Sequence, residues 1–150
     1  MKPSKLLIAA LWLAAVPLAA QAAESAREKA NIRNVEALYN AALNDKNFDE
    51  ARKYIGDRYI QHNPTAHDGL EGLKGFIEFL KTKFPQSHSE IKQAFADGNY
   101  VILHVHSVRV PGTLGRAIVD IFRLEHGKVV EHWDVVQDIP EHPVNSNTMF

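Results

Sequence analysis

The segment 115–137, GRAIVDIFRLEHGKVVEHWDVVQ, alternates apolar and polar residues on both sides of a short turn sequence. Alternation with a period of two is typical of β-strands, and Glu125-His126-Gly127 has the composition of a turn. We therefore predict two paired antiparallel strands, Arg116–Leu124 and Lys128–Gln137. Asp120 falls in the middle of the first strand, where an unpaired carboxylate is costly to bury.

The same period extends upstream and predicts two further strands, Ser87–Ala96 and Tyr100–Val110. Before Pro85 the apolar spacing changes to three and four, which predicts helices over Ser25–Asn44, around Phe48–Ile55, and from Asp68 to Pro85. Helices followed by an antiparallel meander indicate an α+β fold. We expect a curved sheet wrapped around the N-terminal helices, with one internal pocket between the layers.

Residues 1–22 have the pattern of a secretory signal peptide: Lys2 and Lys5, an apolar run over 6–16, and small residues up to Ala22. The apolar run is too short to span a bilayer comfortably. We expect cleavage after Ala22, a folded domain over 23–150, and a secreted or periplasmic protein that is free of the membrane. The remaining net charge of −3 gives no basic surface for nucleic acid, and without cysteine there is no disulfide or thiol chemistry.

The turn at Gly127 can close in two ways, and the choice decides which side chains share a face. A two-residue His126-Gly127 turn places Asp120 opposite Trp133, whereas a three-residue loop places Asp120 opposite His132. We prefer the three-residue loop, because Glu125-His126 suits a type I turn and Gly127 suits the bulge position.

The loop before Arg116 sets the register of the neighbouring strand. We expect Val110 to pair with Arg116, which places His106 opposite Asp120. One apolar face would then carry a polar centre, as small-molecule pockets do. The polar and aromatic residues expected on this face are His104, His106, Asp120, Phe122, His132 and Asp134.

Four motifs resemble SnoaL-like proteins: YIQHNP at 59–64, DGLEG at 68–72, GRAIVDIFR at 115–123 and GKVVEHWDV at 127–135. The resemblance covers nearly all of the chain after residue 22. It implies a cystatin-like α+β cone, the architecture also seen in ketosteroid isomerase and scytalone dehydratase. Named members are polyketide cyclases, which close a ring by intramolecular aldol condensation without a cofactor, and the resemblance places their acid/base aspartate at Asp120.

These observations lead us to expect a cofactor-free enzyme that performs acid/base chemistry next to a carbonyl, such as an aldol cyclase, isomerase or dehydratase. The catalytic candidates are Asp120, His62 and His132; the substrate-binding candidates are Tyr39, Asn63, His104, His106, Phe122 and Asp134.

Three further expectations stay open on the sequence alone. The same pocket could serve an exported binding module for a small apolar ligand, without catalysis. His104, His106 and His132 could hold a metal, but His-x-His alone is a weak motif and the resemblance argues against it, so we predict none. The resemblance also implies a homodimer through the outer sheet face, which would carry Val119, Ile121 and Trp133.

Overall fold

The computed structural model describes residues 18–150, and residues 1–17, which hold most of the predicted signal peptide, lie outside the described part. The helices come first: α1 (Leu18–Tyr39), the π-helical turn η1 (Asn40–Asn44), α2 (Phe48–Arg52) and α3 (Gly69–Lys83). The strands are β1 (Ile55–Gln61), β2 (His88–Asp97), β3 (Tyr100–Val108), β4 (Arg116–Glu125) and β5 (Lys128–Asp138). No helix within residues 18–150 combines the length and apolar character needed to cross a bilayer.

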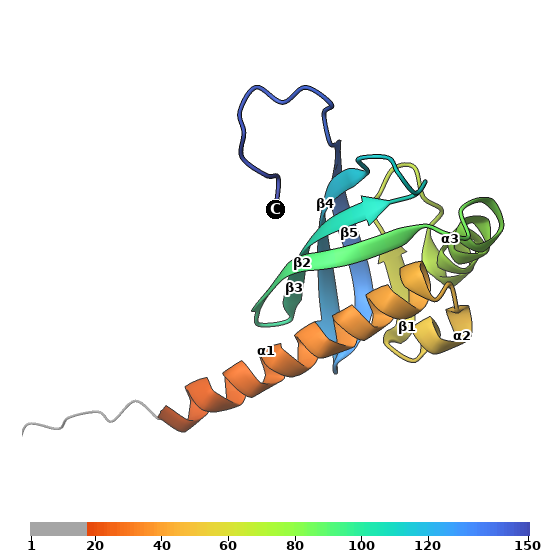
Figure 1. The fold of residues 1–150 in the computed structure, drawn as a ribbon. Helices are drawn as coiled ribbons and strands as arrows, with labels where there is room; N and C mark the ends of the chain where they lie inside the picture. The colour runs from red at the N-terminus through yellow and green to blue at the C-terminus, as the bar shows by residue number, and fades with distance from the viewer. Residues whose placement is uncertain (1–17) are drawn as a thin grey trace, which may run out of the picture.

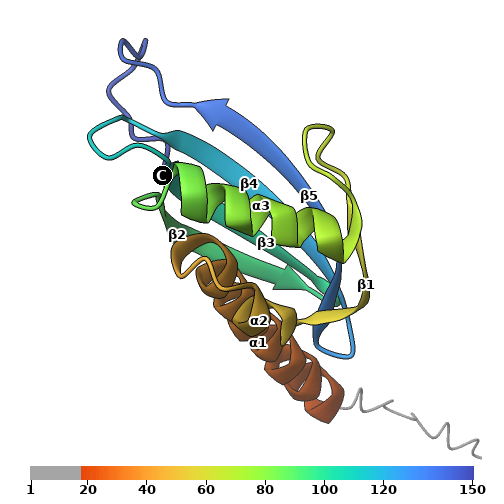
Figure 2. The same ribbon diagram turned by 90° about the vertical axis from the view of Figure 1, so that its right-hand side faces the viewer.

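The five strands form one curved sheet in the order β1-β5-β4-β3-β2. Figures 1 and 2 show α1 and α3 on the same, concave side of this sheet. The predicted α+β fold and the four C-terminal strands are confirmed. The expected antiparallel sheet is present over β2–β5, but the sheet also contains β1, which pairs parallel with β5. No strand was expected at Ile55–Gln61, because this segment lacks apolar–polar alternation. Its pairing with β5 is also interrupted by an irregularity.

The core lies between the concave face of the sheet and the helices. Apolar side chains of the helices pack against the sheet, and every second residue of the central strands points toward them. The fully or almost fully buried side chains include Val35, Leu38, Ile77, Leu80, Val101, Leu103, Val105, Leu124 and Val129.

The turn at Gly127 combines features that we had treated as alternatives. It is a two-residue turn, because Glu125 pairs with Lys128 and both His126 and Gly127 have positive φ. The register then shifts by one residue at Val130, which has no partner on β4. Beyond this bulge Asp120 pairs with Asp134 and Phe122 with His132. The preferred three-residue loop is therefore wrong, but the bulge keeps these four side chains on one face.

The register between β3 and β4 differs from the expected one in a way that does change faces. Ser107, rather than Val110, pairs with Arg116, and Leu103 pairs with Asp120. The difference is three residues, an odd number, so the pocket face of β3 carries Leu103 and not the expected histidines. The expected placement of His104 and His106 beside Asp120 is wrong.

Candidate functional site

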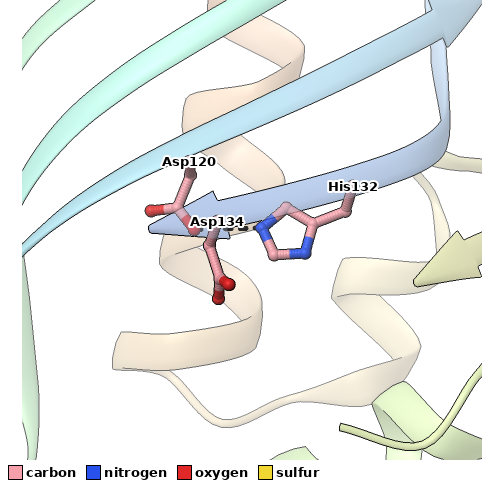
Figure 3. A group of neighbouring side chains, drawn as sticks. All are labelled: Asp120, His132 and Asp134. Atoms are coloured by element: carbon pink, nitrogen blue, oxygen red, sulfur yellow. Dashed lines mark hydrogen bonds and ion pairs between the residues drawn. The ribbon is translucent and has the colours of Figure 1, made fainter. Parts of the chain in front are cut away.

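A cavity of about 1120 Å³ lies on the concave side of the sheet. α1 and α3 supply its apolar walls, and β4 and β5 supply a polar floor. Among the residues that line it are Leu38, Leu73, Phe76, Phe79, Leu80, Ile118 and Phe122. Figure 3 shows the three central polar side chains of the floor, Asp120, His132 and Asp134.

Asp120 is buried and both of its carboxyl oxygens have partners. Tyr39, the last residue of α1, donates its hydroxyl to Oδ2 at 3.0 Å, and His132 Nε2 lies 3.0 Å from Oδ1. Burial first, and then the charge of Asp120, raise the pKa of Tyr39 well above its usual value. The phenol therefore keeps its proton at neutral pH and acts as a donor to Asp120.

Hydrogen bonds around Gln61 fix the role of each His132 nitrogen. Gln61 Oε1 accepts the backbone N–H of Asn63 at 2.9 Å, and the same oxygen lies 3.0 Å from His132 Nδ1. An oxygen cannot donate, so Nδ1 must carry a proton. Nε2 and Asp120 Oδ1 then share one further proton: it lies on the carboxyl group of a neutral pair, or on the imidazole of an ion pair. The site is therefore a buried aspartate–histidine dyad with one transferable proton.

Asp134 is the second carboxylate of the floor. Asn63 Nδ2 lies 2.7 and 2.8 Å from its two oxygens, and the backbone N–H and hydroxyl of Thr65 donate to Asn63 Oδ1. The bonds from Thr65 orient the Asn63 amide so that its NH₂ group faces Asp134. Within residues 18–150, no Lys, Arg or His lies within ion-pair distance of Asp134.

Three possible ligand atoms for a cation, one each from Asp120, His132 and Asp134, lie within 4.8 Å of one another. A cation here would have to replace hydrogen bonds that these groups already make to one another, to Tyr39 and to Asn63. The trio that we considered from the sequence is not assembled, because two of its members lie on the other face of β3.

His104 and His106 lie on the outer face of the sheet. Both rings contact Phe150, with centroid separations of 5.2 and 4.9 Å, and His106 Nε2 lies 2.8 Å from the carbonyl oxygen of Leu114. Neither histidine lines the cavity. Their predicted contact with a ligand in the cavity therefore has no geometric support.

His62 also points away from the cavity. Its ring stacks on Trp133 at 4.5 Å, and Nε2 lies 2.8 Å from Glu131 Oε1. The strand before the loop contributes instead through Tyr59 and Gln61, which both line the cavity and contact His132. Sequence reasoning missed these two residues because it placed no strand there. The remaining candidates, Tyr39, Asn63, Phe122 and Asp134, do line the cavity with the dyad.

Comparison with known proteins assigns the family. The model of the SnoaL-like domain matches residues 35–132, most of the chain, from α1 to His132 of the dyad. The chain belongs to the SnoaL-like family. No protein with a curated description matches the sequence.

Solved structures agree with this SnoaL-like assignment at the level of the fold. A cystatin-fold protein from Novosphingobium aromaticivorans has a TM-score of 0.60 and 24% identity, over 70% of this chain and 97% of its own. A proposed polyketide cyclase from Acidithiobacillus ferrooxidans has a TM-score of 0.61 and 18% identity, over 71% and 87%. An NTF-2 like protein of unknown function from Burkholderia xenovorans LB400 has a TM-score of 0.62 and 20% identity, over 79% and 91%.

Proposed function

We propose that this SnoaL-like protein is a small-molecule enzyme that transfers a proton next to a carbonyl group. Asp120 is the acid/base, and His132 is the partner with which it shares its proton. The observation that carries the proposal is the buried 3.0 Å contact between these groups at the floor of a largely apolar cavity. Aldol ring closure, isomerisation and dehydration all require proton transfer of this kind.

The ion-pair form of the dyad gives Asp120 both halves of the chemistry. As a carboxylate beside a protonated His132, Asp120 accepts a proton from the carbon next to a carbonyl and becomes a carboxylic acid, while the substrate becomes an enolate. Asp120 then returns this proton to a carbon or an oxygen of the product, which restores the ion pair. Tyr39 stabilises the carboxylate through its hydrogen bond to Oδ2. Because these side chains are already in position, no reorganisation is needed when the charge on Asp120 changes.

The family assignment supports the reaction class without naming the substrate. Two similar solved structures, from Acidithiobacillus ferrooxidans and Jannaschia sp. CCS1, are described as proposed polyketide cyclases. One fold can host unrelated chemistries, so the proposal rests on the dyad rather than on these names.

Exchange of substrate protons with solvent tests the proposal directly. Apolar ketones are incubated with the protein in D₂O, and deuterium uptake next to the carbonyl is followed by NMR. Asp120→Asn should reduce the exchange rate by about 10²–10⁴-fold, because Asn cannot take up a proton. The fold should survive, because the Asn amide donates to His132 Nε2 while its oxygen accepts from Tyr39.

Asp57→Asn is the matched control, because Asp57 is an exposed aspartate on β1. It should exchange substrate protons at the wild-type rate. If Asp120→Asn is folded and equally active, the assignment of Asp120 is wrong. If the protein binds ketones but catalyses no exchange or conversion, it is instead a binding module for a small apolar ligand.

We also propose that the protein acts outside the cytoplasm, on the basis of the signal-peptide pattern over residues 1–22. Intact mass measurement of the protein from the periplasmic fraction should give a chain that begins at Ala23. A full-length chain confined to the cytoplasm would contradict export, and it would leave the proposed chemistry unaffected.

A further inference from the structure

A second polar group lies at the far end of the cavity from the dyad. Ser89 on β2 pairs with Ser107 on β3, and Ser107 pairs with Arg116 on β4, so these residues form a row across three strands. Arg109 follows Ser107 by two residues and lies on the same side. All four line the cavity that contains Asp120.

Two arginines, Arg109 and Arg116, lie at this end of the cavity. Within residues 18–150, neither Arg109 nor Arg116 has an acidic oxygen within ion-pair distance, although Asp138 is the cross-strand neighbour of Arg116. The Arg109 guanidinium instead lies 5.7 Å from the ring centre of Phe84. Burial first, and then the charge of Arg116, lower the pKa of Arg109. The charges of Arg109 and Arg116, which line the same cavity, therefore repel each other.

A third observation concerns a hydroxyl group at the same place. Ser87 directly precedes His88, the first residue of β2, and His88 pairs with Val108, the residue before Arg109. Ser87 lines the cavity, and its Oγ is buried without a hydrogen-bond partner. Buried polar atoms are nearly always hydrogen-bonded, so an orphaned hydroxyl in the cavity that also holds two guanidinium groups calls for a hydrogen-bond partner.

We propose that Arg109, Arg116 and Ser87 bind the carboxylate of a ligand whose apolar body extends along the cavity toward Asp120. Guanidinium groups match a carboxylate in shape and charge, and the hydroxyl supplies one further donor. Arg116 and Asp120 are four residues apart on β4, a separation of about 13 Å. The wall between them is apolar, with Ile118 on β4 opposite Val136 on β5.

The proposal specifies the substrate class for the proposed enzyme, and in that respect it rests on the proposed function. The substrate is an apolar or aromatic acid with a reactive carbonyl group at the end remote from its carboxylate. The arginine end fixes the orientation of this acid, so that the carbonyl end reaches the dyad. Binding of the carboxylate itself does not depend on catalysis.

A pair of probes with the same shape isolates the charge. Binding of 2-naphthoate and of its neutral analogue 2-naphthamide is measured by calorimetry on the purified full chain. Naphthoate should bind on the order of tenfold more tightly at low salt, and added NaCl should reduce the difference. Arg109→Gln and Arg116→Gln should each weaken the preference, and the double variant should abolish it.

Three variants control this experiment. Arg58→Gln removes an exposed arginine that pairs with Glu125 outside the cavity, and it should keep the full preference. Arg109→Lys retains the charge and should keep part of it, which separates charge from packing on Phe84. Asp120→Asn should retain the preference even where turnover is lost, so failure of the catalytic proposal remains distinguishable. Equal affinity for the probes, no binding of either, or a preference that survives in the folded double variant would overturn the proposal.

Discussion

The sheet carries a histidine–carboxylate pair on each face. The two pairs have similar nitrogen–oxygen distances and differ in their surroundings. On the concave face His132 lies 3.0 Å from Asp120, with side-chain exposures of 10% and 6%. On the outer face His62 lies 2.8 Å from Glu131, with exposures of 39% and 16%. Coulomb interactions are several times stronger in a protein interior than in water. A short contact alone therefore does not identify the reactive pair.

The networks around the two pairs differ in the same direction. Glu131 also accepts from Arg123 Nε at 2.6 Å, so the outer carboxylate has a permanent cation beside it. Asp120 has no arginine or lysine partner among the described residues; its partners are a phenol and an imidazole. A carboxylate held charged by arginine makes a poor proton carrier, whereas one that shares its proton with imidazole can give it up and take it back.

The largest expected difference in stability comes from removal of each carboxylate. Asp120→Ala leaves the Tyr39 hydroxyl and His132 Nε2 buried without partners, and it should lower the free energy of unfolding by about 3 kcal/mol. Glu131→Ala breaks partly exposed ion pairs and should cost about 1 kcal/mol or less. Urea denaturation of both variants measures the two losses. Equal losses would show that burial does not distinguish the pairs.

The sequence alone could predict which residues of β4 and β5 share a face. The predicted partner of Asp120 was wrong by two residues, from His132 to Asp134, and an even shift preserves the face. The bulge at Val130 produces this result. Nothing in the sequence GKVV at 127–130 distinguishes a bulge after a tight turn from a longer loop, because both place the same residues in the core.

The sequence could not predict the face of β3, because the connection to β4 has no unique length. From the sequence, either Val110 or Ser107 could pair with Arg116. The two registers differ by three residues, an odd number, so the observed register places His104 and His106 on the outer face. β1 could not be predicted for a different reason: its pairing with β5 is parallel and long-range, and its own sequence has no alternation. Because β1 was not predicted, the sequence did not indicate that Gln61 lies beside His132 and hydrogen-bonds to it.

A smaller effect should separate the two sides of the concave pair. Tyr39→Phe removes one hydrogen bond to Asp120 and leaves the contact with His132 in place. We expect a loss of about 1–2 kcal/mol in the free energy of unfolding, and a roughly tenfold slower deuterium exchange of the apolar ketones in D₂O. Tyr100→Phe is the control, because Tyr100 is exposed and packs near Trp133 on the outer side. A loss of stability without slower exchange would assign Tyr39 to packing alone.

The smallest expected effect concerns the outer pair and its dependence on pH. The hydrogen bond from His62, and then the hydrogen bond and the charge of Arg123, lower the pKa of Glu131 from its ordinary value of 4.5. A carboxylate with a lowered folded pKa stabilises the protein fully above its ordinary pKa, and this contribution is lost as the pH falls through the lowered value. The gap in stability between wild type and Glu131→Gln should therefore be present at pH 7 and close in acid below pH 4.5, as urea midpoints across this range would show.

The same gap in stability should narrow in high salt, because partly exposed charges are screened. A gap that persists in acid would mean that Glu131 stabilises the outer face by packing rather than by charge, and the contrast between the two faces would then rest on the concave pair alone.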